Sequence, residues 1–168
     1  MPPLLVLIGP PGSGKTTAAA LVAQRLGVQA RDTDLDIAEA ADTTIADLFV
    51  EHGEAHFRSL ERAAVATALE QSDGVLSLGG GAILDADTRA LLAGRQVVFL
   101  DVTIKHAASR IGLNRDRPLL LGNPRAQWIR LMEARRPLYD EVATLTVDTD
   151  AKTPDEVADE IVAAVSRG

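Results

Sequence analysis

Short apolar runs recur along the chain and alternate with longer stretches in which apolar residues follow the helical period. The runs predict five strands, at residues 4–8, 28–32, 74–81, 96–101 and 143–148. The intervening stretches predict helices at residues 16–26, 43–53, 54–71, 84–94, 103–111, 126–136 and 153–166. Strands and helices therefore alternate, which is typical of an α/β protein.

This alternation predicts one parallel sheet of five strands with helices on both faces. The 168 residues match the usual size of one domain, so we expect a single domain over residues 1–168. In such folds ligands collect beyond the carboxyl ends of the strands. The stretches at 9–17, 32–36 and 79–81, which are rich in glycine or aspartate, all fall there. We therefore expect the site at this edge of the sheet.

Several helix boundaries are marked by particular residues. One of two threonines, Thr43 or Thr44, is expected to cap the helix that follows. Thr153 and Glu156 form a capping box at the start of the last helix. Pro137 predicts the end of the helix that begins at residue 126, because proline lacks the N–H that continues a helix.

Composition and charge narrow the possible partners. The formal net charge is −7 and only 3% of the residues are aromatic, which opposes general binding to nucleic acid or to an anionic membrane surface. The chain has no cysteine, so disulfides and thiolate chemistry are excluded. Its first apolar run is only five residues long and follows no basic start, which predicts neither a signal peptide nor a membrane span. We expect a soluble, cytoplasmic, monomeric protein that acts on small molecules.

Residues Gly9 to Thr16, GPPGSGKT, match the pattern G-x-x-x-x-G-K-[ST]. In this pattern backbone N–H groups surround a phosphate chain at a helix N-terminus. Gly12 and Gly14 permit positive φ angles and a close backbone approach, Lys15 would reach the β- and γ-phosphates, and the Thr16 hydroxyl would bind Mg²⁺. An ordinary turn from strand to helix is the alternative. The match at all fixed positions, directly after a buried strand, favours nucleotide binding.

Two aspartates, Asp32 and Asp34, follow the second predicted strand. On an extended segment they would point in different directions, so one would hold the water shell of a metal ion and the other would face an acceptor hydroxyl. Helix capping by a cluster of acids is the alternative. Their place beside a phosphate-binding loop favours the functional interpretation.

Several further residues carry both a structural and a functional interpretation. Arg58 and Glu61 are three apart on a helix and predict an ion pair, although Arg58 would equally bind a carboxylate. The glycines after the third strand form either a tight turn or a close approach of backbone to a ligand, and three in succession favour the ligand; they are Gly79, Gly80 and Gly81. His52 and His56 are separated by a glycine with no third ligand nearby, so we expect surface residues and not a metal site.

Residues 112–124 are longer than a usual connection and predict a mobile lid. Arginines lie in and around this segment: Arg110, Arg115, Arg117 and Arg125. Guanidinium groups there would neutralise charge on a transferring phosphoryl group. Arg117 precedes a proline that fixes its backbone, and Arg136 precedes Pro137 at the predicted helix end. These two are the strongest functional candidates, whereas Trp128 is expected to pack.

The motifs GPPGSGKTT, DTD, FR, GGG, RPLL and RRPLY occur in this order, and together the chain resembles the shikimate kinase family over nearly its whole length. The resemblance implies a three-layer P-loop kinase fold, a substrate-binding segment at residues 33–61 and a mobile lid at 112–124. It also implies transfer of the γ-phosphate of ATP to the 3-hydroxyl of shikimate in the chorismate pathway of aromatic amino acid biosynthesis. Thr16 replaces a common serine, and Lys152 stands where arginine is expected.

The resemblance assigns roles to particular residues. ATP would lie on Gly12, Ser13, Gly14, Lys15, Thr16 and Thr17, with its adenine between Arg110 and the residues from Lys152 to Pro154. Mg²⁺ would be held by Thr16 and, through water, by Asp32. Arg58 and Arg136 would hold the carboxylate of shikimate, with Glu61 orienting Arg58 and with Gly79, Gly80 and Gly81 completing the pocket. Asp34 would bind the ring hydroxyls and act as base, and Lys15 and Arg117 would stabilise the transferring phosphoryl group.

Other functions remain open from the residues alone. Another small-molecule kinase, such as a gluconate kinase or a nucleoside monophosphate kinase, would use the same phosphate loop with other acceptor residues. A nucleobase acceptor would need a larger, more aromatic pocket. A nucleotide-switched binding module would need an N-K-x-D motif to read guanine, and the sequence has none.

Overall fold

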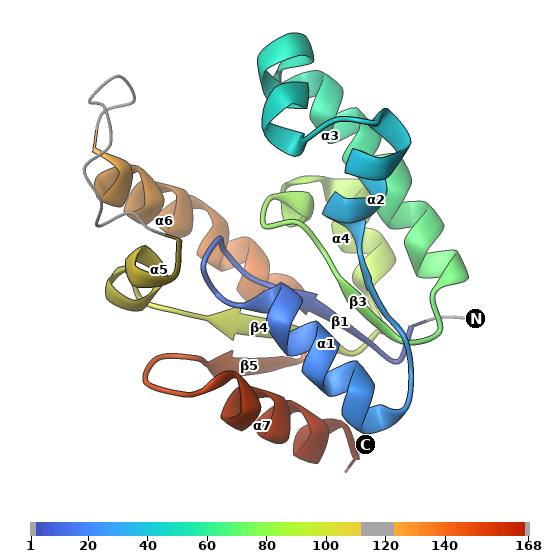
Figure 1. Ribbon diagram of the computed structural model, residues 1–168, viewed down its shortest axis with the longest axis vertical. Coiled ribbons are helices and arrows are strands. Elements are labelled where there is room, and N and C mark those ends of the chain that lie inside the picture. The colour runs from blue at the N-terminus through green and yellow to red at the C-terminus, as the bar shows by residue number, and fades with distance from the viewer. Residues whose placement is uncertain (1–2, 112–122, 167–168) are drawn as a thin grey trace.

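The computed structural model describes residues 3–111 and 123–166 and shows one five-stranded sheet between helices (Figure 1). The strand order is β2-β3-β1-β4-β5, and every pairing is parallel. The strands are β1 (Leu5–Ile8), β2 (Ala30–Asp32), β3 (Val75–Ser77), β4 (Val97–Asp101) and β5 (Leu145–Asp148). The helices are α1 (Lys15–Leu26), α2 (Thr33–Ala41), α3 (Ile45–Gln71), α4 (Ala86–Leu92), α5 (Ile104–Ile111), α6 (Pro124–Val142) and α7 (Pro154–Ser166), with a short 3₁₀ helix η1 (Ala82–Leu84). The predicted α/β class and parallel sheet are confirmed.

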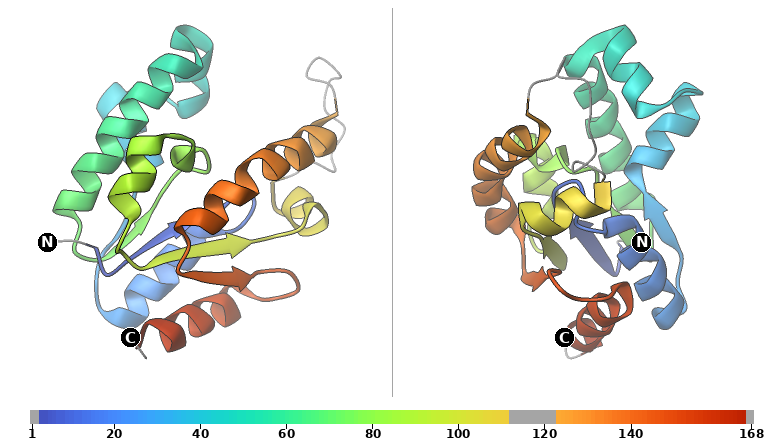
Figure 2. Two further views of the ribbon diagram at one scale, coloured as in Figure 1. Left: turned by 180° about the vertical axis from the view of Figure 1, so that it is seen from behind. Right: turned by 60° about the vertical axis from the view of Figure 1, so that its left-hand side comes forward.

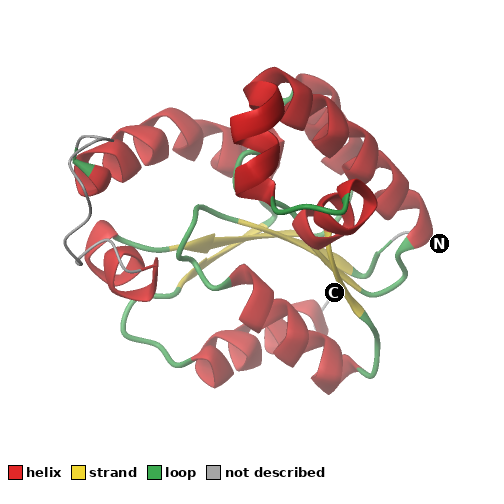
Figure 3. Cartoon of the chain, turned by 45° about the horizontal axis from the view of Figure 1, so that its top comes forward, coloured by secondary structure: helices red, strands yellow, loops and turns green. Residues whose placement is uncertain are grey.

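The helices form a layer on each side of the sheet (Figures 2 and 3). Leu5 and Leu7 of β1 pack with α1 and α7, whereas Val6 and Ile8 pack with α3, α4 and α6. Successive side chains of a strand point to opposite faces, so an uninterrupted apolar strand is expected where both faces are covered. All four residues of β1 are at most 1% exposed. This central strand therefore anchors both cores.

The position of β1 in the sheet determines where the site lies. It pairs with β3 on one side and β4 on the other. In the chain, however, β1 is followed by α1 and β2, and β3 and β4 come later. The strand order reverses at this point, which opens a crevice at the carboxyl ends of the strands. The loop from Gly9 to Gly14 fills that position.

The expectation that Asp34 lies on an extended segment is wrong. Helix α2 begins at Thr33, and the Asp32 carboxylate accepts a hydrogen bond from the Asp34 N–H at 2.8 Å. This is an N-cap, so the capping alternative correctly describes the local structure. The start of α2 was not predicted from the sequence, because the carboxylates of DTDLD fit either a helix cap or a ligand site.

The expectation that Pro137 ends a helix is also wrong, because α6 continues to Val142 with Pro137 inside. A proline within a helix costs about 3 kcal/mol or more. Tyr139 is fully buried, and Leu138 and Val142 pack against the core. Burying such side chains stabilises by about 1.5–3 kcal/mol each, which outweighs the lost hydrogen bond. Arg136 therefore lies within the helix and not at its end.

The capping predictions for α3 and for the last helix are confirmed, whereas helix α2 was not predicted. Thr44 caps α3, and Gly53 breaks its regularity with φ 84° and ψ 172°. Thr153 and Glu156 exchange hydrogen bonds of 3.0 and 3.1 Å as a capping box. Among the described residues, no helix combines the length and the apolar character needed to cross a membrane.

Candidate active site

The loop after β1 has the geometry of a phosphate cradle. Gly12 and Gly14 have φ angles of 84° and 86°, which favour glycine. A Cβ at Gly12 would lie 3.0 Å from Ala107 of α5, so the close packing also requires glycine. Helix α1 follows with Gly14 as N-cap and no side-chain cap. Its first N–H groups are therefore available to an anion.

Lys15 lies within the cradle and is held by backbone oxygens. Its Nζ donates to the Gly9 carbonyl at 2.7 Å and to the Pro10 carbonyl at 3.2 Å. Burial lowers its pKa to about 8, although Asp34 and Asp32 act in the opposite direction. The ammonium group is thus fixed at the mouth of the loop, where it can meet a phosphate.

Thr16 and Asp32, the two residues predicted to hold Mg²⁺, lie next to each other. The Thr16 hydroxyl donates to Asp32 Oδ2 at 3.2 Å, and Asp32 Oδ1 caps α2. A hydroxyl and a carboxylate are the ligands that Mg²⁺ prefers beside a nucleotide, so this pair fits the metal. Among the described residues, no group of three or more acidic, histidine or cysteine side chains is placed to hold a metal ion.

A cleft of about 580 Å³ extends from this loop toward β5. Arg110 bridges its two walls: its guanidinium donates to the Gly12 carbonyl at 3.0 Å and to the Thr149 carbonyl at 2.9 Å. Lys152 and Pro154 also line the cleft, and Lys152 Nζ is paired with Glu160 at 2.9 Å. The structure thus brings together the three residues expected around the adenine.

On the other side of the loop, polar groups from α2 and α3 converge on the three glycines. A Cβ at Gly79 would lie 2.6 Å from Asp34 Oδ1 and 2.9 Å from Glu61 Oε2. A Cβ at Gly81 would lie 2.5 Å from the guanidinium nitrogens of Arg58. A side chain at Gly79 or Gly81 would therefore displace these polar groups, which accounts for two of the three glycines.

Arg58 and Glu61 form the predicted ion pair, with a distance of 2.8 Å between Nη1 and Oε1. The Arg58 guanidinium also lies over the Phe49 and Phe57 rings, 5.9 and 5.3 Å from their centroids. Burial raises the pKa of Glu61, whereas Arg58 opposes the rise. Glu61 is only 3% exposed, and its carboxylate is paired with Arg58.

Asp34 lies at the junction of the two halves of the site. Burial raises the pKa of Asp34, and the nearby Asp32 carboxylate raises it further. The cations Lys15 and Arg58 oppose this rise. A carboxylate with a raised pKa is a better proton acceptor near neutral pH than an ordinary aspartate.

Arg136, which was predicted to bind the carboxylate together with Arg58, does not lie beside Arg58 in the structure. Arg136 forms a two-pronged ion pair with Asp101, at 2.9 and 3.0 Å, and lies over Phe99. Arg135 points to the site instead: its Nη1 lies 3.5 Å from the Cβ position of Gly80, and its charge acts on Lys15 and Glu61. Arg135, and not Arg136, is therefore the candidate for a second cation beside Arg58.

Sequence reasoning missed Arg135 because the two arginines are adjacent. The spacing of apolar residues along α6 could have separated them. The buried residues of this helix are Trp128, Met132 and Tyr139, which recur at the helical period. Arg135 follows at the same spacing of three to four and shares their face, whereas Arg136 is turned by about 100°. Arg117 and most of the predicted lid lie outside the described residues.

Comparison with known proteins identifies the family. A family profile described as shikimate kinase matches residues 11–166. Shikimate kinase of Streptomyces coelicolor is 58% identical over 163 residues, which cover 97% of this chain and 95% of that protein. This chain belongs to the shikimate kinase family. Shikimate kinase of Streptomyces avermitilis is 59% identical over the same length and coverage.

Solved structures of other members agree with the assignment to the shikimate kinase family. Shikimate kinase from Acinetobacter baumannii in complex with shikimate matches with a TM-score of 0.90 at 32% identity, covering 99% of this chain and 94% of that one. A gluconokinase from Sinorhizobium meliloti 1021 matches with a TM-score of 0.62 at 22% identity. At that identity the likeness concerns the fold alone. The P-loop kinase fold predicted from the sequence is confirmed.

Proposed function

We propose that this member of the shikimate kinase family transfers the γ-phosphoryl group of ATP to the 3-hydroxyl of shikimate, giving shikimate 3-phosphate and ADP for the chorismate pathway. The observation that supports it most is the convergence of Asp34, Arg58 and Arg135 on the glycines beside the phosphate loop. A carboxylate and two guanidinium groups suit a small acid that carries hydroxyls. Family membership favours shikimate over gluconate.

The nucleotide half would bind through the loop and the cleft. The N–H groups at the start of α1 and the Lys15 ammonium would hold the phosphates, and Arg110 would define the edge of the adenine site. Thr16 and, through water, Asp32 would hold Mg²⁺, which supplies positive charge that neutralises the phosphates. Arg117 retains its predicted role in stabilising the transferred group.

The acceptor half would orient shikimate by its carboxylate. Arg58, aimed by Glu61, and Arg135 would form charge-assisted hydrogen bonds to it. Asp34 would accept the proton of the 3-hydroxyl as that oxygen attacks the γ-phosphorus in line with the departing ADP oxygen. Asp34 Oδ1 and Arg58 Nε are buried without a hydrogen-bond partner. A bound acceptor substrate would supply the missing hydrogen bonds.

The oligomeric state proposed with this function is a monomer. The use of ATP suits a cytoplasmic enzyme. A coupled assay of ADP release with Mg²⁺-ATP and shikimate, gluconate, AMP or quinate tests the proposal. We expect release that depends on shikimate, and a preference for another acceptor would overturn it.

A further inference from the structure

Helix α6 hydrogen-bonds the backbone on both sides of the site. Near its start, Trp128 Nε1 donates to the Pro11 carbonyl of the phosphate loop at 3.0 Å. About three turns later, the Tyr139 hydroxyl donates to the Gly80 carbonyl at 2.6 Å. Arg135 lies on the same face between them. One rigid helix therefore touches the loop for the donor and the loop for the acceptor.

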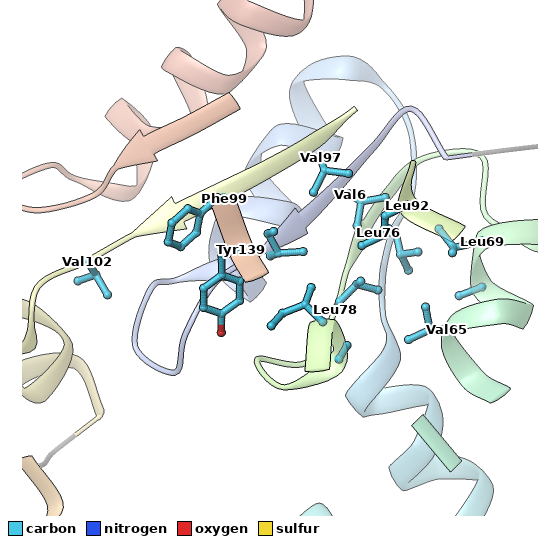
Figure 4. Packing of buried hydrophobic residues seen from close by; sticks show 14 of the residues in the cluster. Val6, Val65, Leu69, Leu76, Leu78, Leu92, Val97, Phe99, Val102 and Tyr139 are labelled. Atoms are coloured by element: carbon cyan, nitrogen blue, oxygen red, sulfur yellow. The ribbon is translucent and has the colours of Figure 1, made fainter. Parts of the chain in front are cut away.

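Tyr139 has little freedom to move. It is fully buried and stacks on Phe99 of β4, with ring centroids 4.8 Å apart and planes at 22°. Figure 4 shows the two rings side by side, with the tyrosine oxygen pointing away from the strands. Burial raises the pKa of Tyr139 to about 12, so the hydroxyl keeps its proton and remains a donor to Gly80.

The same hydroxyl lies beside the guanidinium group of Arg135. Arg135 acts on the pKa of Tyr139 through both its charge and a side-chain hydrogen bond. The Cβ position of Gly80 is 3.5 Å from Arg135 Nη1 and 3.3 Å from the Gly9 carbonyl. A hydroxyl can donate one hydrogen bond and accept others. Tyr139 can therefore hold a backbone carbonyl and a cation of the site at once.

We propose that Tyr139 is a positioning residue for the carboxylate of the acceptor, because its hydroxyl fixes the Gly80 backbone and directs Arg135 into the pocket. The inference rests on the proposed function and extends it from the residues that touch shikimate to one that does not. It requires no contact between Tyr139 and either substrate. Its effect is specific to the acceptor, since the helix contacts the phosphate loop through Trp128.

The variant Tyr139→Phe tests this directly, since it keeps the ring and its stacking and removes only the oxygen. Leaving a buried carbonyl and a guanidinium without this partner should raise KM for shikimate about tenfold. KM for ATP and kcat should each stay within about twofold, because the phosphate loop keeps its contacts. An unchanged KM for shikimate would overturn the proposal.

Phe99→Leu is the matched control, because it removes the stacking partner and leaves the hydroxyl in place. It should lower Tm at least as much as Tyr139→Phe but raise KM for shikimate clearly less, because the hydrogen bond to Gly80 is retained. Equal increases in KM in both variants would show a merely structural role and overturn the proposal. The double variant Tyr139→Phe with Arg135→Ala should raise KM no further than Arg135→Ala alone, and full additivity would also contradict it.

A measurement on the unaltered protein covers the case in which Tyr139→Phe does not fold. The chain has a single tyrosine, so tyrosine absorption reports on this hydroxyl. Because the carboxylate of shikimate would pair with the Arg135 cation beside this hydroxyl, adding shikimate without ATP should produce a tyrosine difference band in the near-ultraviolet, and its absence would overturn the proposal. If the wild type releases no ADP with shikimate, the proposed function itself fails. If the wild type is active and Tyr139→Phe is unaffected, only the role of Tyr139 fails.

Discussion

At the scale of single residues, Asp34 and Asp36 lie on the same helix but in different surroundings. Asp34 faces Lys15, Arg58 and Gly79, whereas Asp36 pairs with Arg31 at 2.7 Å outside the pocket. If Asp34 accepts the proton of the attacking hydroxyl, Asp34→Asn should lower kcat by about 10²–10⁴-fold. Steady-state kinetics with circular dichroism as a folding check would measure this. Asp36→Asn is the control and should retain near-normal kcat; a similar loss in both variants would refute the assignment.

The adjacent arginines Arg135 and Arg136 offer a second comparison of neighbours. Arg135→Ala should weaken shikimate binding by about 2–5 kcal/mol, because a charged partner of the carboxylate is removed. Arg136→Ala should leave shikimate binding within a factor of about two, since its guanidinium is engaged by Asp101. Isothermal titration with shikimate and with an ATP analogue would separate the effects. Weaker binding of shikimate in Arg136→Ala, with Arg135→Ala unaffected, would reverse the assignment.

At the scale of elements, α4 depends on its N-cap. Asp85 accepts hydrogen bonds from the Thr88 N–H at 2.9 Å and from Arg62 at 2.8 Å. Asp85→Ala should therefore lower the free energy of unfolding by about 0.5–2 kcal/mol. Urea denaturation would measure this. Asp87→Ala, in the exposed first turn of the same helix, should change stability by less than half as much, and an equal loss would contradict a capping role.

The same cap predicts a dependence on pH. Partial burial alone would raise the pKa of Asp85, but hydrogen bonds from Thr88 and Arg62 hold it below its usual value of 3.8. A lowered pKa in the folded state stabilises the protein above the unfolded pKa, and this contribution is lost as pH falls through the folded pKa. The difference in unfolding free energy between wild type and Asp85→Ala should thus be full above about pH 5 and shrink below about pH 4. A difference that stays constant down to pH 3 would contradict it.

At the scale of the whole molecule, ligand binding should stabilise the fold through the crevice beside β1. A ligand at 100 times its Kd adds about 2.7 kcal/mol, which for a protein of this size raises Tm by roughly 5–11 °C. Scanning calorimetry with an ATP analogue and Mg²⁺, and separately with shikimate, should show both increases. Lys15→Ala should abolish the increase with the analogue and retain the increase with shikimate. Loss of both in this variant would indicate that the two sites are not separate.

Much of the site could be predicted from sequence because its chemistry depends on residues that are adjacent in the chain. Gly12, Gly14, Lys15 and Thr16 form the cradle within one loop and one helical turn. Asp34, Arg58 and Gly79 come from separate elements. The predicted strand ends placed Asp34 and Gly79 at one edge of the sheet, but only the resemblance to a family pattern added Arg58. The missed contacts of Trp128 and Tyr139 to loop carbonyls have no sequence signature, since any backbone carbonyl can accept.

By itself the sequence determined the alternation of elements, the phosphate loop, a cap by Thr43 or Thr44 and the capping box at Thr153, because each rests on backbone torsions and hydrogen bonds within a few consecutive residues. Only the tertiary structure decided that α6 passes through Pro137 and that Arg135, not Arg136, faces the acceptor pocket. The physical reason is that the rotation and length of a helix are set by the apolar side chains that it buries against the sheet. Those contacts join residues that lie far apart in the chain, so the helical period shows which residues of α6 share a face but not which face meets the site.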